Sequence, residues 1–572
     1  MKRKTKTVVW AVSQVIAAMA LTALLGLSVG CNRTGSHTLH ILSTGDVHGA
    51  WFDSTYSGSG LKCSLFAVNT YVDSLRAEFG DDNVLLIDAG DVLQGDNAAY
   101  YFNYENTDAP HLYPRLAAYM GYDAVTVGNH DIETGHPVYD KVNAQLRKAG
   151  IPWLGGNALD KNGKPYFTEY KVFKRAGLKV LVLGYTNPNI PAWLGESLWS
   201  GMKFESLLPF VQQRVDAVKA RVRPDVTVVV VHSGTGDGDG SELESQGLEL
   251  FESLAGVDVL ITAHDHRPTV KCSDGIVLVN SGSKAYNLGH VSLTADLKGG
   301  KVVSRQSSAE IIKVDRRKAD PEMREAFAAD FEKVRNFTNS EVGKTAFEIR
   351  TRDAYAGQSP YMDLIHTAAL WCTGAQLSIS APLTFNAVIP EGKLVFNDMF
   401  VIYPYENGLY KISLTGRELK DYMERNYDDW ICTFDGEHVL KIVNVPDTRT
   451  GLKRWSFMNR SFNFDSVAGI NYTVDVTRPA GERIEILSLA DGSAFDLDAT
   501  YSVAANSYRC AGRGWNDRVE EKYPEYREVI YKFIKEKGTL REDDIAGTGS
   551  WSFVPKDIAD KAISNDMSLI FN

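Results

Sequence analysis

Short apolar runs separated by helix-like stretches organise the first half of the chain. The runs occur in LHIL, NVLLI, DVTVVVV and VDVLI, and helix-like stretches such as AVNTYVDSLRAEF and VYDKVNAQLRKAG lie between them. Apolar runs that do not alternate indicate strands buried on both faces, and the intervening helices indicate a layered α/β core. KVLVLGYT and GIVLVNSGS add two strands of the same kind.

The second half alternates helices with strands, and YTVDV shows the alternation of a half-buried strand. A charged stretch without glycine, RRKADPEMREAFAADFEKVRNFT, precedes it and predicts a helix that links two domains. Because a chain of 572 residues exceeds one typical core, more than one domain is expected. We place the two domains at residues 38–315 and 340–555, with the linking helix at 316–339.

The composition is that of an ordinary globular protein, with 44% hydrophobic and 23% charged residues. The formal net charge of −11 disfavours a nucleic-acid polymer as a partner. An anionic substrate would need cations placed locally against this acidic background. The six cysteines include no CxxC pair, which disfavours a zinc–thiolate site.

The first 30 residues resemble a targeting signal. MKRKTK supplies positive charge, VVWAVSQVIAAMALTALLGLSVG supplies a long apolar run, and Cys31 follows. A transmembrane anchor is the alternative, because the run is nearly long enough to span a bilayer. Small residues that run into a cysteine resemble a bacterial lipoprotein signal, although Ser28 stands where leucine is usual. We expect export to the periplasm or cell surface, with a lipid on Cys31 that anchors the protein to the membrane.

Polar residues follow directly where five of the strands end. They lie in GDVHG, AGDVLQG, VGNHD, VHSG and AHDH, at Asp46, His48, Asp91, Asn129, His232, His264 and His266. Ligands of layered α/β folds bind beyond the carboxyl ends of the strands, so these side chains are expected to share one edge. Residues i and i+2 of an extended chain point to the same side, which would let Asp46 and His48 converge.

This mixture of imidazole, carboxylate and amide groups is typical of a metal site. It suits zinc, manganese or iron better than calcium. Seven donors exceed what one ion takes together with its waters, so we expect two adjacent divalent ions, an arrangement used for displacement at phosphorus. The alternative is that each histidine is an isolated core or surface residue, and the gathering of all these groups at strand ends disfavours it.

The five motifs, in their order along the chain, resemble the calcineurin-like metallophosphoesterase pattern. SAPLTFNAVIPEGKLVFNDMFVIYPYENG, FNFDSVAGINYTVDVTRP and YSVAANSYRCAGRG resemble the C-terminal domain of the two-domain 5'-nucleotidase family. Within that family the chain looks most similar to the 2',3'-cyclic-nucleotide 2'-phosphodiesterase/3'-nucleotidase branch. The resemblance implies an N-terminal four-layer α/β/β/α metallophosphoesterase sandwich and a C-terminal mixed α/β domain that binds substrate.

The resemblance also implies a role for each matched residue. The first metal ion would be held by Asp46, His48 and His266, the second by Asn129, His232 and His264, with Asp91 bridging the two. His130 matches the catalytic histidine beside the leaving oxygen, and Asp131 and Glu133 are further catalytic candidates. The implied substrate-binding residues are Tyr405 and Tyr508, which would sandwich the base, and Asn407 of the same pocket.

The sequence departs from the family pattern at three of the matched positions. Ala263 begins the last metal motif where glycine is usual, which should be tolerated if the turn accepts a methyl group. Glu133 replaces the aspartate that many 5'-nucleotidases have three residues after the catalytic histidine, so we do not expect the usual pairing with His130. Asn386 aligns with a phosphate-binding arginine of typical 5'-nucleotidases, which disfavours 5'-monophosphates as preferred substrates.

We expect dinuclear-metal hydrolysis of 2',3'-cyclic nucleotides and 3'-nucleotides by a monomer that holds zinc, manganese, iron or cobalt. A 5'-nucleotidase or nucleotide-sugar hydrolase on the same site is one alternative. A non-catalytic lipoprotein that binds nucleotides is another, but such a protein would not need Asp91, Asn129 and His130. The acidic segment TGDGDGSELESQG lacks the Gly-Lys-Ser/Thr of a phosphate-binding loop and predicts a flexible surface segment.

Overall fold

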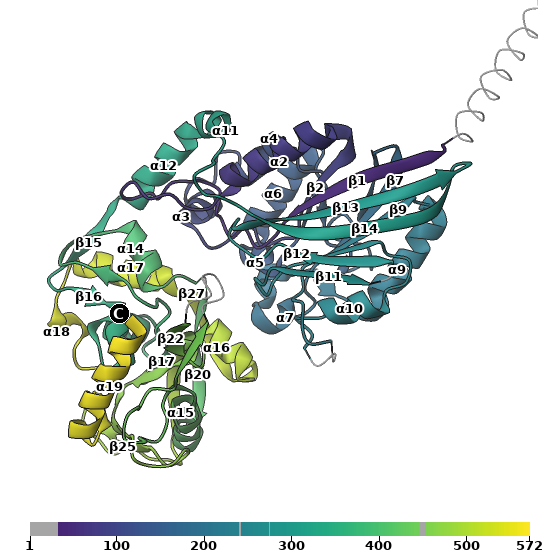
Figure 1. Ribbon diagram of the computed structural model, residues 1–572. Helices are drawn as coiled ribbons and strands as arrows, with labels where there is room; N and C mark the ends of the chain where they lie inside the picture. The colour runs from purple at the N-terminus through teal and green to yellow at the C-terminus, as the bar shows by residue number, and fades with distance from the viewer. Residues whose placement is uncertain (1–32, 239–241, 274, 406, 447–452, 572) are drawn as a thin grey trace, which may run out of the picture. The chain divides into compact units, whose positions relative to one another are not determined.

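The computed structural model describes residues 33–238, 242–273, 275–405, 407–446 and 453–571 (Figure 1). The chain divides into two compact units, Met1–Phe331 (unit 1) and Glu332–Asn572 (unit 2). The expected signal at residues 1–30 and the expected lipid site at Cys31 lie outside the described residues. Among the residues that are described, no helix combines the length and the apolar character needed to cross a bilayer.

Unit 1 contains two six-stranded sheets within its described residues. The first sheet has the order β14 (Lys301–Lys313), β13 (Asn287–Lys298), β1 (Gly35–Thr44), β2 (Val84–Asp88), β3 (Ala124–Thr126) and β4 (Trp153–Leu154). The second has the order β11 (Thr269–Ser273), β12 (Ile276–Asn280), β10 (Val259–Thr262), β9 (Val226–Val231), β7 (Leu178–Tyr185) and β6 (Tyr170–Arg175). Within each sheet four neighbouring strands run parallel, namely β1 to β4 and then β7, β9, β10 and β12. The loops that follow them therefore lie at one edge of each sheet.

The two sheets pack face to face, and their inner faces form one apolar core. This core includes Leu39 and Leu85 from the first sheet and Val182, Val228 and Ile261 from the second, all almost fully buried. Burial of apolar surface contributes about 25 cal/mol per Å² and is the main favourable term in folding. The face-to-face packing therefore fixes where the strands of one sheet end relative to those of the other.

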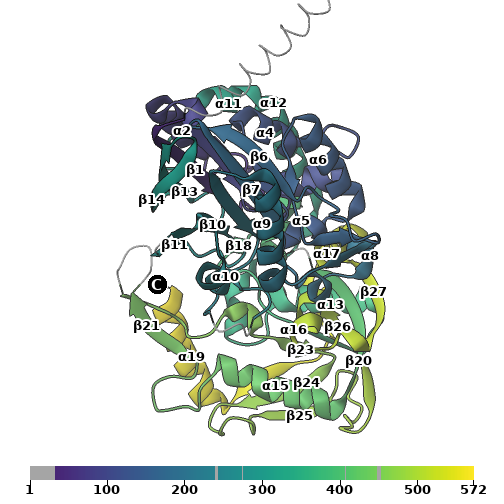
Figure 2. The same ribbon diagram turned by 90° about the vertical axis from the view of Figure 1, so that its right-hand side faces the viewer.

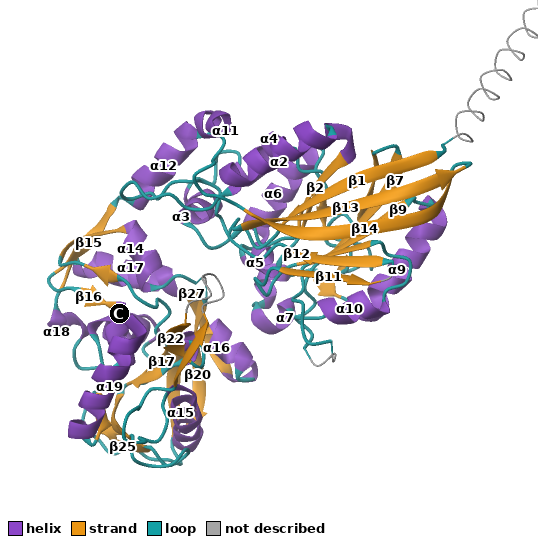
Figure 3. Cartoon of the chain, viewed as in Figure 1, coloured by secondary structure: helices purple, strands orange, loops and turns teal. Residues whose placement is uncertain are grey.

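Helices cover the outer faces of both sheets. Val229 and Val231 of β9 point away from the inner core and pack with Val211 and Val215 of α9 (Leu207–Val222). The other covering helices are α10 (Gly247–Ser253) on this side and, outside the first sheet, α2 (Leu65–Phe79), α4 (Leu112–Met120) and α6 (His136–Lys148) (Figure 3). The expected α/β/β/α sandwich is confirmed, and β9 lacks alternation because both of its faces are covered.

The segment expected to be one linking helix at 316–339 contains two helices, α11 (Pro321–Ala326) and α12 (Ala328–Thr338). The Asp320 carboxylate caps α11, because it accepts the backbone N–H groups of Glu322 and Met323 at 2.9 and 3.2 Å. Phe327 leaves the helical conformation between the two helices, with ψ 11°. Its ring packs 6.2 Å from that of Phe66, so tertiary packing interrupts a stretch whose local sequence favours one helix.

Unit 2 is a mixed α/β domain, as expected. Its main sheet has the order β23 (Ser466–Ala468), β17 (Leu377–Ser380), β26 (Thr500–Asn506), β20 (Gly408–Thr415) and β27 (Val519–Glu525). Two smaller sheets are β25 (Ile484–Leu489), β24 (Ile470–Asp475) and β29 (Trp551–Val554), then β19 (Gly392–Val395), β15 (Glu341–Thr345) and β28 (Thr539–Leu540). The helices around them include α13 (Pro360–Thr373), α14 (Phe396–Ile402), α15 (Gly416–Trp430), which lies beside β24 and β25 in Figure 2, α16 (Ser507–Gly512) and α17 (Tyr526–Lys537).

Aromatic side chains form much of the core of unit 2. Trp430 stacks on Tyr427 with ring centroids 5.1 Å apart, and it stacks on Phe464 with centroids 5.3 Å apart. The same core includes Ala559 and Ile563 of α19 (Lys556–Phe571), the yellow C-terminal helix of Figure 1. The unit therefore continues past residue 555, where we expected the domain to end.

Candidate metal centre and aromatic surface

The seven expected metal ligands lie in loops that follow five parallel strands of unit 1. They are Asp46 and His48 after β1, Asp91 after β2, Asn129 after β3, His232 after β9, and His264 and His266 after β10. Backbone hydrogen bonds of 2.9 Å join the first two loops, from Asp46 N–H to Gly90 O and from His48 N–H to Asp91 O. The loop after β10 joins them, because His264 N–H donates to Asp46 Oδ2 at 2.8 Å.

Asp46, His48 and His266 form the first group of donors. One possible ligand atom from each lies within 4.8 Å of the others. The Nε2 atoms of His48 and His266 are 2.9 Å apart, and His266 Nε2 is 3.9 Å from Asp46 Oδ1. Three donors that converge from two loops on one point are the arrangement expected for a single divalent ion.

Asp91, Asn129, His232 and His264 form the second group. Asn129 Oδ1 lies 3.1 Å from His232 Nε2 and 2.9 Å from His264 Nδ1, and Asp91 Oδ2 lies 3.0 Å from His232 Nε2. The two groups are adjacent, because Asp46 Oδ1 of the first is 3.9 Å from His232 Nε2 of the second. The structure thus brings together all seven residues that the sequence suggested.

Hydrogen bonds on the far side of two imidazoles set their orientation. His232 Nδ1 lies 2.8 Å from Ala89 O, and His48 Nδ1 lies 3.1 Å from Gln94 Oε1. A proton held on Nδ1 by such acceptors leaves the lone pair of Nε2 directed into the centre. Gln94 follows Asp91 in the same loop, but no spacing rule marked it as the partner of His48.

Five of the seven ligands have a left-handed backbone conformation. Asp46 and His48 both have φ 48°, and Asp91, His264 and His266 have φ 59°, 78° and 59°. The expectation that Asp46 and His48 converge as alternate residues of an extended strand is therefore wrong. They converge because the chain leaves β1 and turns twice through a region that costs most residues about 1–3 kcal/mol.

One buried atom of the donor groups has no hydrogen-bond partner among the described residues. Asp46 is fully buried; its Oδ2 accepts the His264 N–H, whereas its Oδ1 accepts no hydrogen bond. An orphaned carboxylate oxygen is costly unless it is protonated or faces a cation. This atom, the imidazole nitrogens and the Asn129 oxygen form a donor set that fits divalent zinc, manganese, iron or cobalt.

The charges of the metal-free centre are strongly coupled. Burial lowers the pKa of His48 well below its usual range and that of His266 to about 4, so both are neutral near neutral pH. Burial raises the pKa of Asp46 well above its usual range. Burial also opposes the charge of His232, but the nearby Asp91 carboxylate outweighs it and raises the pKa of His232 to about 9. His232 and Asp91 thus form a buried ion pair in the absence of metal.

His130 pairs with Glu133, contrary to our expectation. His130 Nδ1 lies 2.5 Å from Glu133 Oε2, because one turn of α5 (Asn129–Glu133) brings residues i and i+3 to the same face. The backbone N–H of His130 donates to Asp91 Oδ1 at 2.8 Å, and the rings of His130 and His48 lie edge to face at 5.4 Å. The imidazole of His130 therefore lies beside the first group of donors.

Asp131 supports the ligand loop and does not face the donors. Its carboxylate is fully buried and accepts the N–H groups of Gly128, Asp91, Val92 and Leu93 at 2.8–3.1 Å. Four N–H donors occupy both oxygens, so this geometry gives Asp131 a positioning role and not the catalytic one expected from the sequence. Gly128 is constrained by its approach to Asp91, since a Cβ there would lie 2.0 Å from Asp91 Oδ1.

Ala263 occupies its turn without strain. It is fully buried and is not among the described residues with a positive φ. A Cβ built on Gly45 would lie 3.3 Å from the Cβ of Ala263, so the methyl group fills the space beside a glycine of the first loop. The departure from the usual glycine is accommodated in this way.

Two residues near His264 were not anticipated. The ring of Trp193, at the end of α7 (Ile190–Trp193), stacks on His264 with centroids 5.3 Å apart, and Glu244 Oε2 lies 3.7 Å from His264 Nε2. Glu244 belongs to the acidic segment that we expected to be flexible. Its carbonyl accepts hydrogen bonds from Gly234 N–H, Ser233 Oγ and Asn187 Nδ2 at 3.0–3.1 Å, so this part of the segment is held in place.

Exposed aromatic rings gather on unit 2 near the expected substrate-binding residues. Tyr405 and Tyr508 are 42% and 48% exposed. Burial, together with the neighbouring Tyr508 phenol, raises the pKa of Tyr405. The ring nearest Tyr508 is Phe462 of the short helix η4 (Ser461–Asn463), with centroids 6.5 Å apart and planes at 78°. We call Phe462 and Tyr508 the ring pair. Phe462 was missed because an aromatic residue is a core residue by default.

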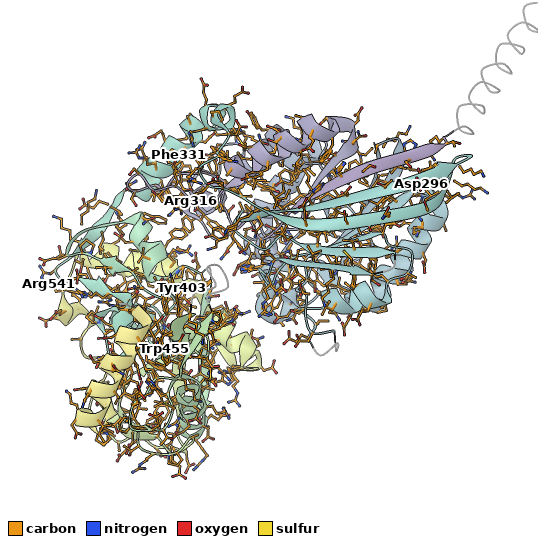
Figure 4. The ribbon with its side chains drawn as sticks, viewed as in Figure 1. Asp296, Arg316, Phe331, Tyr403, Trp455 and Arg541 are labelled. Atoms are coloured by element: carbon orange, nitrogen blue, oxygen red, sulfur yellow. The ribbon has the colours of Figure 1, made fainter. Side chains whose placement is uncertain are left out.

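Asn407 lies beneath this surface. Its Nδ2 donates to the hydroxyl of Tyr403 at 3.3 Å, and Asn506 Nδ2 donates to the same hydroxyl at 3.0 Å. Tyr403, labelled in Figure 4, is itself fully buried. The amide of Asn407 thus supports the loop that carries Tyr405.

Comparisons with known proteins agree with this division of the chain. Residues 39–268 match the family model of calcineurin-like phosphoesterases, and residues 337–517 match that of the 5'-nucleotidase C-terminal domain. A Salmonella typhimurium 2',3'-cyclic-nucleotide 2'-phosphodiesterase/3'-nucleotidase is 25% identical over 565 residues, covering 87% of this chain and 84% of that protein. A Vibrio vulnificus 5'-nucleotidase is 23% identical over 570 residues, covering 90% and 93%. The crystal structure of a Staphylococcus aureus protein assigned as a 5'-nucleotidase, in complex with alpha-ketoglutarate, has the same fold, with a TM-score of 0.74 at 20% identity and coverage of 90% and 99%.

Replacing Asp91 should disassemble the metal centre. Asp91→Ala should lower bound metal to about one ion per chain or less and abolish hydrolysis, because Asp91 lies 3.0 Å from His232 Nε2 and Asp46 lies 3.9 Å away. Metal content by mass spectrometry and activity should fall together. Asp123→Asn is the control, since Asp123 pairs with Arg175 at a half-buried position of unit 1 outside both donor groups. Full metal occupancy with normal turnover in Asp91→Ala would contradict the assignment.

Metal loading should release protons near neutral pH. A pKa of about 9 keeps His232 protonated there, and it must lose this proton to bind a metal ion through Nε2. Release from His232 should therefore be present below a pH of about 9 and fade above it. Calorimetric titration of the metal-free protein in buffers of different ionisation enthalpy measures the number of protons released per metal ion bound. Proton release that does not change across this pH range would show that His232 is neutral before metal binds.

Proposed function

Because the chain combines a calcineurin-like phosphoesterase domain with a 5'-nucleotidase C-terminal domain, it belongs to the two-domain 5'-nucleotidase family, and we propose that it hydrolyses 2',3'-cyclic nucleotides and 3'-nucleotides. The observation that carries this proposal is the convergence of two adjacent donor groups in unit 1. The metal-dependent phosphoesterase reaction follows from that centre and the family. The choice of substrate is supported by the name of the Salmonella typhimurium relative and by Asn386, where typical 5'-nucleotidases have a phosphate-binding arginine.

The residues of unit 1 would hold two divalent ions. Asp46, His48 and His266 would bind one ion and Asn129, His232 and His264 the other, with Asp91 between them. When bound, such ions supply Lewis acidity and positive charge to a phosphoryl group and lower the pKa of water. Among the described residues, no serine or cysteine belongs to either donor group, so direct transfer of the phosphoryl group to water is proposed.

His130 would act on the leaving oxygen. Glu133 fixes the ring, because its Oε2 lies 2.5 Å from His130 Nδ1. A protonated imidazole beside the donors can give its proton to the ribose oxygen as the phosphorus–oxygen bond breaks. Asp131 would contribute indirectly by holding the loop that carries Asp91.

Tyr405 and Tyr508 would bind the base between their exposed rings. Stacking on an aromatic face is worth about 1–3 kcal/mol per base and accepts every base, because each has a π-surface. Phe462 packs edge to face against Tyr508 and would support that ring. Purine and pyrimidine nucleotides should therefore both be accepted.

An activity panel tests the proposed function. The substrates are 2',3'-cyclic AMP, 3'-AMP, 5'-AMP, a nucleotide sugar and an aryl phosphate diester, each with zinc, manganese or cobalt. We expect the highest kcat/KM for 2',3'-cyclic AMP and 3'-AMP. A preference for 5'-AMP or the nucleotide sugar would contradict the proposed substrate but not the proposed metal centre. Absence of hydrolysis with every metal would overturn the assignment as an enzyme.

The role of His130 can be separated from metal binding. His130→Ala should keep metal content and KM while lowering kcat by about 10²–10⁴-fold, the range for a positioned general acid. Glu133→Gln should lower kcat less, because the imidazole remains. A parallel loss of metal in His130→Ala would make His130 a ligand.

The ring pair predicts which aromatic residues set KM. Tyr508→Ala and Phe462→Ala should each raise KM for 3'-AMP about tenfold and leave aryl phosphate hydrolysis unchanged. Tyr405→Ala should also raise KM for 3'-AMP, because the Tyr405 and Tyr508 phenols lie close enough to interact electrostatically. Trp371→Ala, an exposed aromatic of α13, is the matched control. Equal loss of 3'-AMP and aryl phosphate hydrolysis in Tyr508→Ala would contradict the base-binding role.

We further propose that the protein is exported and carries a lipid on Cys31. The motif that supports this is the apolar run that ends in Gly30 and Cys31. Cys31→Ser should move the protein from the membrane fraction to the soluble fraction and abolish incorporation of labelled palmitate. Membrane attachment that survives this substitution would favour the alternative of a transmembrane anchor.

A further inference from the structure

We infer that Arg509 is a positioning residue that holds the two members of the ring pair, Phe462 and Tyr508, at a fixed separation. The inference rests on the proposed function, because it assigns a role to residues behind the proposed base-binding surface. It concerns unit 2 alone.

Arg509 follows one member of the ring pair in sequence and binds the segment that carries the other. It is only 5% exposed, and its guanidinium carbon lies 5.9 Å from the centre of the Tyr508 ring. Its Nη2 donates to the carbonyl of Phe462 at 3.1 Å, and its Nη1 donates to Asn463 Oδ1 at 3.2 Å. One side chain of α16 thus spans the gap to η4.

Asp465 fixes the guanidinium from behind. Arg509 Nη2 donates to Asp465 Oδ1 at 3.0 Å, and Arg509 Nε lies 2.9 Å from Asp465 Oδ2. The Tyr422 hydroxyl donates to the same carboxylate, and Asn426 Nδ2 donates to the Asp465 carbonyl at 2.7 Å. Both α15 residues belong to the core of the unit, so the guanidinium is held on a rigid support.

The backbone of α16 is held as well. Asn506 Oδ1 accepts the N–H of Arg509 at 2.7 Å and so caps the helix that carries Tyr508. The Nδ2 of Asn506 donates to the Tyr403 hydroxyl, which connects this helix to the loop of Tyr405. The segments that carry Tyr405, Phe462 and Tyr508 therefore meet at Asn506 and Arg509.

A buried ion pair is not required for stability. Well-packed apolar residues of similar volume often replace such a pair without loss of stability. What an apolar pair cannot supply is a planar fork of donors aimed at Phe462 and Asn463. A gap of about 0.5–1 Å removes about a quarter to a half of the attraction between two contacting atoms. A displacement of Tyr508 by this distance would therefore weaken the stacking of a base on its ring.

The test uses the full chain loaded with metal and three measurements: KM for 3'-AMP, the inhibition constant of adenosine, and kcat for an aryl phosphate. Arg509→Ala and Arg509→Lys should each raise KM and the adenosine inhibition constant about tenfold, with kcat for the aryl phosphate within about twofold. The lysine in Arg509→Lys should not restore KM or adenosine inhibition, because lysine lacks the planar fork of donors. Arg509 variants with unchanged KM and unchanged adenosine inhibition would overturn the inference.

A matched control and a paired variant keep the result interpretable if Arg509→Ala unfolds. Arg483→Ala removes an equally buried arginine, which pairs with Asp428 elsewhere in unit 2, and should leave adenosine inhibition unchanged even if the melting temperature falls. Arg509→Met combined with Asp465→Asn removes both charges, so the unit should fold while adenosine inhibition stays weakened. Wild-type adenosine inhibition in this paired variant would show that the ion pair is only structural.

Failure of the inference is distinguishable from failure of the proposed function. If Phe462→Ala and Tyr508→Ala weaken adenosine inhibition and the Arg509 variants do not, only the positioning role is overturned. If none of these substitutions changes adenosine inhibition while the aryl phosphate is hydrolysed, the base-binding surface itself is overturned, and the positioning role with it.

Discussion

The face-to-face packing of two sheets in unit 1 is the constraint on which the metal centre depends. Four parallel strands of each sheet end at one edge, and the shared core holds those edges in register. Loops as far apart in sequence as those of Asp46 and His266 therefore meet within 4 Å. A shift of one sheet against the other would separate the ligands after β9 and β10 from those after β1, β2 and β3.

The centre concentrates strain and charge that the apolar core must support. Five ligands have left-handed φ values, and each such residue costs about 1–3 kcal/mol. Asp46 buries an oxygen that accepts no hydrogen bond from the described residues, while Asp91 and His232 form a buried ion pair. Hydrogen bonds between the loops offset part of this cost, as do the four N–H groups that Asp131 accepts. Bound ions would neutralise the remainder, so the folding of these loops and metal binding are thermodynamically linked.

Much of this arrangement could be predicted from the sequence, and the failures have physical causes. Unalternated apolar runs located the strands, and the polar residues that follow them lie together in two adjacent groups. Asp46 and His48 do converge, but from left-handed backbone conformations that leave no pattern in a sequence at non-glycine residues. Asp131 lies among ligands in sequence and points to backbone N–H groups in space. The roles proposed for Phe462 and Arg509 depend on contacts between segments more than 40 residues apart, which periodicity does not reveal.

Anomalous X-ray diffraction from crystals of the protein loaded with zinc or manganese tests the central claim most directly. The account predicts two anomalous peaks about 3.5–4 Å apart in unit 1. One peak should contact Asp46, His48 and His266, the other Asn129, His232 and His264, with Asp91 touching both. A single peak, or peaks bound by other residues, would contradict the account of two ions held at the edge shared by the two sheets.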